Sequence, residues 1–99
     1  MISQKKILER DINNIVYLKA DSNYTYFHFN CGNKTITSYT LKHWQALLSN
    51  TLFIRIHKSY LINKSMIKSI NRKNHTISLS NGDDIPISRG QRKEFMKST

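Results

Sequence analysis

The chain has 99 residues, a length that suits one small domain with a single hydrophobic core. Only 38% of the residues are apolar and the formal net charge is +10, which excludes a thick apolar sandwich and points to nucleic acid, anionic lipid or an acidic protein as partner. The cationic side chains run from Lys5 to Lys97, so we expect a folded cationic body rather than a basic arm on a neutral domain. One domain over residues 1–99, with its core at about 12–96, is predicted.

Alternating side chains predict strands in the first third of the chain. Residues 12–20 carry apolar groups on both faces, which favours a central strand that is covered on both sides. Residues 24–29 alternate Tyr24, Tyr26 and His28 with smaller or apolar neighbours, and turn residues separate them from a polar strand at 34–38. These two segments predict a hairpin.

The period then changes to that of a helix, at residues 40–49. Thr40 is placed to cap its N-terminus. The apolar residues of one helical stripe are Leu41, Trp44, Leu47 and Leu48. A stripe this narrow needs a sheet to cover it, so we expect a short packing helix.

Residues 53–63 form a β-rich run with cationic and hydrogen-bonding side chains in it. Ile54 and Ile56 are expected on one face of the strand, and Arg55 and His57 on the other. Residues 58–60 follow at the strand's end, where a base edge or a phosphate can be approached from a rigid scaffold. An ordinary edge strand with a solvated polar face is the alternative interpretation.

The last third predicts a meander of three short strands, at residues 66–70, 75–80 and 84–88. A three-residue loop at 81–83 pairs Leu79 with Ile85 and keeps both side chains on the buried face. Pro86 lacks an N–H donor, which places the final strand at a sheet edge or beside a bulge. A cationic turn or short helix is expected at residues 89–96.

Patterns typical of catalytic and metal sites are absent from the sequence. The only neighbouring carboxylates are adjacent in a loop, the four histidines are widely spaced without cysteine ligands, and three glycines make no phosphate-binding loop. We therefore expect no enzyme, no cofactor and no metal. Cys31 is the only cysteine, in a turn, which favours a reducing cytoplasm. No apolar window is long enough to span a bilayer.

Four motifs lie between residues 21 and 89, within a pattern of order and spacing that runs from about residue 12 to residue 95. They are Asp-Ser-Asn-Tyr at 21–24, Thr-Leu-Lys at 40–42, Phe-Ile-Arg-Ile-His-Lys-Ser-Tyr-Leu-Ile-Asn at 53–63, and Asn-Gly followed by Ile-Pro-Ile-Ser-Arg at 81–89. In this order and spacing they resemble the LytTR DNA-binding domain, an output module of bacterial response regulators. The resemblance implies a mostly β fold, an elongated stack of small antiparallel β-sheets with one short α-helix, which presents loops to DNA.

The resemblance also implies how the residues divide between bases and backbone. Base readout in the major groove is expected from Asn23, Tyr24, Lys58 and Arg89. Contacts to the DNA backbone are expected from Arg55, His57, Ser59 and Arg92. The planar fork of Arg89 suits the O6 and N7 acceptors of guanine. Tyr24 could instead be a core aromatic that props its loop, and Gly90 stands where the family commonly has a bulkier polar residue.

The sequence therefore predicts a sequence-specific binder of double-stranded DNA that regulates bacterial transcription. We expect a monomer alone, two copies brought together on paired repeat half-sites, and no membrane partner. An RNA-binding or ribosome-associated basic β-domain is the alternative, because Tyr24, Tyr26 and His28 could stack on unpaired bases. A protein-interaction module for an acidic partner is the third interpretation.

Overall fold

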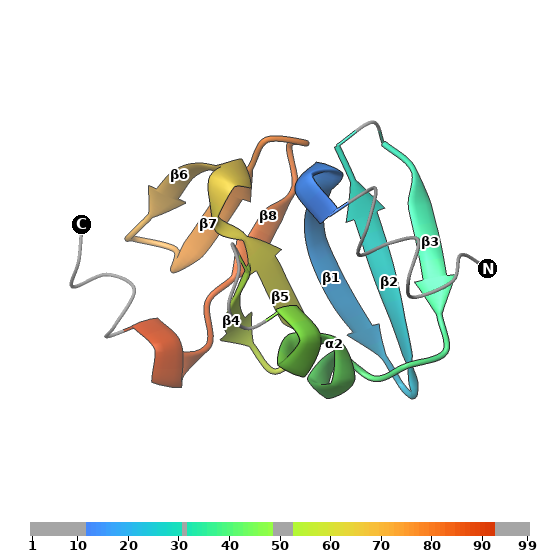
Figure 1. Cartoon of the computed structure of the whole chain (residues 1–99). Helices are drawn as coiled ribbons and strands as arrows, with labels where there is room; N and C mark the ends of the chain where they lie inside the picture. Colours follow the sequence, from blue (N-terminus) through green and yellow to red (C-terminus); the bar gives the residue numbers. More distant parts are fainter. Residues whose placement is uncertain (1–11, 31, 49–52, 93–99) are drawn as a thin grey trace.

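The fold consists of two antiparallel sheets and one short helix (Figure 1). The computed structural model describes residues 12–30, 32–48 and 53–92. The larger sheet has the order β3-β2-β1-β5-β4 and the smaller one the order β6-β7-β8. The strands are β1 (Ile15–Asp21), β2 (Tyr24–Phe29), β3 (Lys34–Thr37), β4 (Phe53–His57), β5 (Tyr60–Asn63), β6 (Ile67–Asn71), β7 (Thr76–Leu79) and β8 (Asp84–Pro86). The helix is α2 (Leu41–Leu48), and 3-10 turns lie at Ile12–Asn14 and Lys64–Met66.

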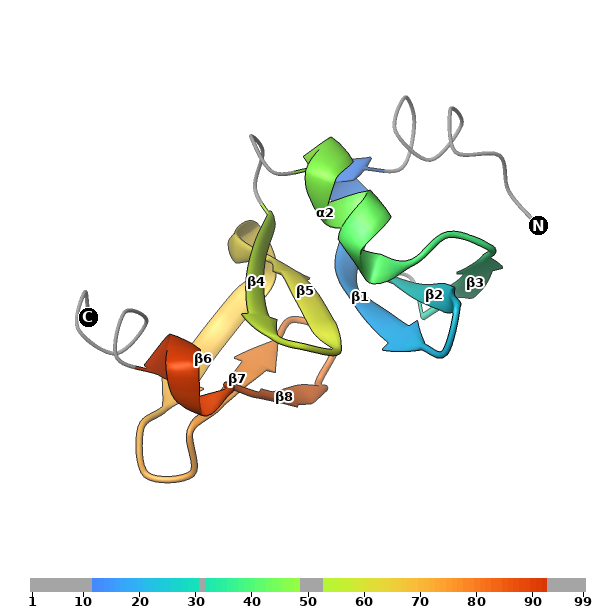
Figure 2. The same ribbon diagram turned by 90° about the horizontal axis from the view of Figure 1, so that it is seen from below.

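The elongated, mostly β architecture expected from the sequence is confirmed. The principal extents are 38 × 24 × 23 Å. Figure 2 shows α2 on one side of the five-stranded sheet and the three-stranded sheet on the other. The larger sheet is therefore the middle layer, with a separate apolar cluster on each of its faces.

β1 is the central strand of the larger sheet and is covered on both faces, as predicted. A bulge at Val16 breaks the simple alternation. Ile15 and Leu18 consequently join the cluster beneath α2, while Val16 and Tyr17 join the cluster between the sheets. The strand begins at Ile15 rather than residue 12, because the preceding residues form a 3-10 turn.

The helix packs on the sheet through Trp44, which is fully buried. Its ring lies edge-on against Phe27, with ring centroids 4.8 Å apart, and its Nε1 donates to Thr37 Oγ1 at 2.9 Å. The predicted N-cap is confirmed, since the His43 N–H donates to Thr40 Oγ1 at 3.3 Å. The prediction for Leu47 is wrong: it is 42% exposed, because the eight-residue helix buries only the stripe Leu41, Trp44 and Leu48.

The smaller sheet is the predicted meander, but its last register differs from the prediction. Ile77, and not Leu79, lies opposite Ile85. The tight turn closes one residue earlier than expected, with the Gly82 N–H donating to Leu79 O at 2.9 Å and Gly82 at φ +92. Glycine is the residue that adopts this left-handed conformation at least cost, so its position sets the turn.

A two-residue shift of register leaves every side chain on the same face. Ile77, Leu79, Ile85 and Ile87 are therefore all buried despite the difference. Pro86 is exposed on β8, an edge strand, as predicted. After Ser88 a helical turn begins at residues 89–92. The predicted continuation to residue 96 and the prediction for Cys31 lie outside the described residues.

Candidate nucleic-acid interface

Three loops that are distant in sequence lie along one edge of the molecule, the lower edge in Figure 1. They are the β1–β2 turn, the β4–β5 turn and residues 89–92. Backbone hydrogen bonds join them in a row: the Ala20 N–H donates to Ser59 O at 2.8 Å, and the Ser88 N–H donates to Ile56 O at 2.8 Å. We call these three loops the loop edge. Because these hydrogen bonds tie the loops to the packed sheets, the sheets fix the positions of the loops relative to one another.

The β1–β2 turn presents two of the predicted base-reading residues. Ser22 has φ +54, the left-handed conformation that lets the chain reverse between Asp21 and Tyr24. Asn23 is exposed and Tyr24 is 49% exposed. Tyr24 is therefore a surface aromatic, and its alternative interpretation as a core residue is wrong.

The β4–β5 turn is shaped from within by Arg55. Its Nε donates to His57 O at 2.8 Å, its Nη2 to Lys58 O at 2.5 Å, and its Nη1 to Gln45 Oε1 on α2 at 2.5 Å. Partial burial lowers the pKa of the guanidinium, but arginine is so strong a base that the group stays protonated. All three guanidinium nitrogens thus donate hydrogen bonds within the protein.

The imidazole of His57 is also tied to the turn. Its Nδ1 accepts the Ser59 N–H at 3.1 Å, so the neutral ring carries its proton on Nε2. The ring meets that of Tyr60 edge-on, with centroids 5.5 Å apart. Ser59 and His57 are half-buried, whereas Lys58, at the tip of the turn, is exposed.

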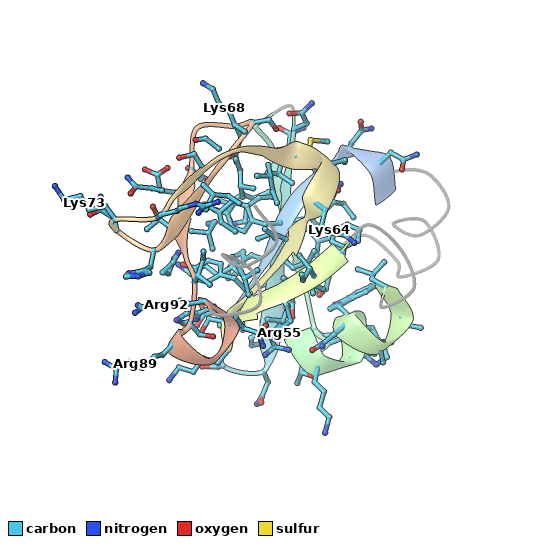
Figure 3. The ribbon with its side chains drawn as sticks, turned by 90° about the vertical axis from the view of Figure 1, so that its left-hand side faces the viewer. Arg55, Lys64, Lys68, Lys73, Arg89 and Arg92 are labelled. Carbon is cyan, nitrogen blue, oxygen red and sulfur yellow. The ribbon has the colours of Figure 1, made fainter. Side chains whose placement is uncertain are left out.

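The third loop places two arginines at the same edge. Arg89 is exposed, and within the described part of the chain its guanidinium forms no hydrogen bond. Arg92 is half-buried and its Nε donates to Ile87 O at 3.1 Å, while its terminal nitrogens form no hydrogen bond to another residue of the described ranges. Figure 3 shows Arg55, Arg89 and Arg92 toward the lower end of the molecule, while Lys68 and Lys73 lie higher, on the β6–β7 sheet.

The fold thus brings together the eight residues that the sequence analysis assigned to DNA contact, whereas Tyr26 and His28, its other candidates for stacking on unpaired bases, lie on the sheet face. Asn23, Tyr24, Lys58 and Arg89 are exposed on the loop edge, with Ser59, His57 and Arg92 beside them. Arg55 differs, because its hydrogen bonds are internal. The sequence did not indicate Gln45, the partner of Arg55 on α2, since nothing in its local pattern distinguishes it from any polar residue of a surface helix.

Among the described residues no group of three or more His, Cys, Asp or Glu side chains is placed to hold a metal ion. No helix in this part of the chain has the length and apolar character needed to cross a bilayer.

Comparison with known proteins identifies the family. The model of the LytTr DNA-binding domain matches residues 5–99. The chain belongs to this family. A solved LytTr DNA-binding domain from Bacillus cereus superposes with a TM-score of 0.76 at 30% sequence identity, covering 86% of this chain and 80% of that one. The LytTr fold inferred from the motifs is therefore confirmed.

Two longer proteins are similar to most of this chain. The sensory transduction protein LytR of Staphylococcus haemolyticus is 30% identical over 100 residues, which cover 90% of this chain and 39% of that protein. The transcriptional regulatory protein LytR of Staphylococcus aureus is 33% identical over 88 residues, covering 86% of this chain and 35% of that protein. This LytTr chain therefore spans less than two-fifths of the length of either relative.

Proposed function

We propose that this LytTr domain binds duplex DNA in a sequence-specific manner, reading the major groove with the loop edge, as the non-enzymatic output module of a bacterial two-component response regulator. The observation that carries the proposal is the loop edge itself. Three loops joined by backbone hydrogen bonds expose Asn23, Lys58 and Arg89 on a rigid sheet, within a chain of net charge +10. Positioned donors on a cationic scaffold are what base readout requires.

The exposed side chains match base edges in the major groove. Arg89, whose guanidinium forms no hydrogen bond to another described residue, has a planar fork that fits the O6 and N7 of guanine, and Lys58 can donate to the same acceptors. Asn23 has the donor and acceptor pair that fits N6 and N7 of adenine. The ring of Tyr24 offers an apolar surface to a thymine methyl group. The three loops would then read separate base pairs along one groove.

Backbone contacts are proposed for the residues that flank these readers. His57 has its Nε2–H available for a phosphate oxygen, because its Nδ1 is occupied by the Ser59 N–H. The Ser59 hydroxyl and the terminal nitrogens of Arg92 supply further donors. For Arg55 the internal hydrogen bonds favour a supporting role, in which it holds the turn that carries Lys58.

The assembly proposed is a monomer in solution and two copies on paired repeat half-sites, with the cytoplasm as the place of action. The described residues include a single eight-residue helix and no long apolar helical face suited to a stable dimer. Sedimentation of the free protein should show a monomer, and sedimentation with a two-site duplex should show two copies. A tight dimer without DNA would contradict this part of the proposal.

The deciding experiment compares Arg89→Ala with Lys73→Ala, a matched loss of one exposed cation away from the loop edge (Figure 3). A preferred site is first selected from random duplex. Arg89→Ala should cost about 1–3 kcal/mol on that site and far less on a scrambled duplex, with the melting temperature unchanged. Lys73→Ala should change neither affinity by a comparable amount. Equal losses on both duplexes would remove Arg89 from base readout.

The same titrations test the phosphate contacts. With about five to eight phosphate contacts, log affinity should fall against log salt with a slope of roughly −4 to −7, because counterions are released. A slope shallower than about −2 on the preferred duplex would contradict a surface dominated by phosphate contacts.

A further inference from the structure

A second surface lies on the face of the larger sheet that is turned away from α2. An open hollow of about 380 Å³ is formed there by β1, β2 and β3. Its lining includes Tyr17, Lys19, Asp21, Tyr26, His28 and Lys34. The strand register explains the grouping, because Tyr17 pairs with His28 and His28 with Lys34. Cross-strand neighbours point to the same face, so these three side chains form one row across the hollow.

Two ammonium groups border the hollow. Lys19 pairs with Tyr26 in the next row, and its Nζ lies 5.9 Å from the ring centroid of Tyr60. The Nζ of Lys34 lies 5.9 Å from the ring centroid of Tyr26. Within the described residues neither ammonium is paired with a carboxylate. The exposed Asp21 lies at the end of the hollow nearest the loop edge, so an anion would be held locally beside the two ammonium groups rather than by the hollow as a whole.

Aromatic rings lie between the two lysines. His28 is stacked on Tyr17, with ring centroids 4.2 Å apart and an angle of 11° between the planes. The Tyr17 hydroxyl donates to Asp83 Oδ2 at 2.8 Å, which fixes the tyrosine from below. Burial, and then the positive charges of Lys34 and Lys19, lower the pKa of His28 against the opposing pull of Asp83. The imidazole is therefore held in place by its stacking on Tyr17, and its neutral form is favoured.

We propose that this hollow binds a nucleotide, with the base over the rings of Tyr26 and His28 and the phosphate at the border of the hollow, within reach of the ammonium groups of Lys19 and Lys34, the latter moving off the Tyr26 ring to admit the base. Its volume lies in the range of about 300–1,000 Å³ typical of small-molecule sites. Base stacking on aromatic rings beside cations is the general mode by which proteins hold unpaired bases. The nucleotide belongs either to the free pool or to an unpaired strand, since both offer a base with its phosphate.

The site is separate from the loop edge, and it does not depend on the proposed reading of duplex DNA. A base paired in a duplex has its faces covered by its neighbours and cannot stack on Tyr26. The duplex therefore engages the loops while an unpaired nucleotide engages the sheet face. A variant that loses duplex binding therefore need not lose nucleotide binding, and the reverse also holds.

The test titrates the protein with adenosine monophosphate, with inorganic phosphate and with a ten-residue oligothymidylate, followed by nuclear magnetic resonance. Resonances of Tyr26 and His28 should shift, with a dissociation constant below about 1 mM for the monophosphate or for the oligonucleotide. The pKa of His28 should rise in the complex, because a neighbouring phosphate favours the imidazolium. Saturation by the monophosphate would identify the free pool as the source, and binding of the oligonucleotide alone would identify an unpaired strand.

Variants distinguish binding at this site from a general effect of the positive charge of the protein. The double variant Lys19→Ala/Lys34→Ala should weaken nucleotide binding about tenfold. Tyr26→Leu should weaken the binding of the nucleotide without changing the binding of inorganic phosphate. Lys68→Ala/Lys73→Ala removes the same charge from exposed positions elsewhere and should change binding less than about twofold. The proposal would be overturned by dissociation constants above about 10 mM for both nucleotide probes. It would equally be overturned if the two double variants had the same effect, or if the selected duplex displaced the nucleotide.

Discussion

Replacing Arg55 by lysine tests whether this side chain shapes the β4–β5 turn or contacts DNA itself. Lysine keeps the charge, but one ammonium cannot reach His57 O, Lys58 O and Gln45 Oε1 at once, as the guanidinium does. Each hydrogen bond contributes about 0.5–1.5 kcal/mol. The freed groups are partly exposed and regain water, so we expect the free energy of unfolding to fall by about 1–3 kcal/mol in total.

The effect on DNA binding follows from the same contacts. Without the donors to its backbone, Lys58 loses its fixed position, and affinity for the preferred site should fall while affinity for a scrambled duplex is retained. Thermal melting and duplex titrations of Arg55→Lys measure both quantities. Lys58→Ala is the matched control, which should lower specific affinity without changing the melting temperature.

A double-mutant cycle makes the test sharper. If Arg55 acts by positioning Lys58, the two substitutions should be non-additive in specific affinity, because the second removes a contact that the first has already weakened. A fully stable Arg55→Lys protein with unchanged specificity would refute the positioning role, since a direct phosphate contact tolerates lysine and a bidentate turn clamp does not.

Three further substitutions test the scaffold. Asn63→Ala should lower the free energy of unfolding by about 1–3 kcal/mol in urea, because the buried Asn63 side chain donates to Ile15 O at 2.8 Å and that carbonyl would lose its partner. Gly82→Ala should lower the free energy of unfolding by about 1–2 kcal/mol through the positive φ alone, since an added Cβ meets nothing within 4 Å. Gly90 is equally open, so Gly90→Ala is the control and should not destabilise the protein. Stability should fall as pH drops from about 6.5 through the lower folded-state pKa of His28, because the unfolded chain binds the proton more readily, and a pH series on His28→Gln should show a flatter profile.

Local periodicity was sufficient to locate most elements. The alternation in residues 24–29 sends Thr25, Phe27 and Phe29 to the core and leaves Tyr24 exposed, and the stripe after Thr40 forms the helix. These patterns can be read in sequence because each reflects the geometry of one strand or helix, which repeats over two residues or about three and a half. The resemblance to the family indicated which loop residues are candidates for contact with DNA.

Register, bulges and side-chain partners depended on the tertiary structure. Two registers of β7 against β8 bury the same isoleucines, so burial could not choose between them, and the left-handed conformation of Gly82 did. Arg55 reads from sequence as a cation facing solvent, yet its donors are taken by its own turn and by Gln45. Likewise, Asn23, Lys58 and Arg89 meet at one edge only because hydrogen bonds between strands bring distant loops together, and no local pattern encodes contacts of that range.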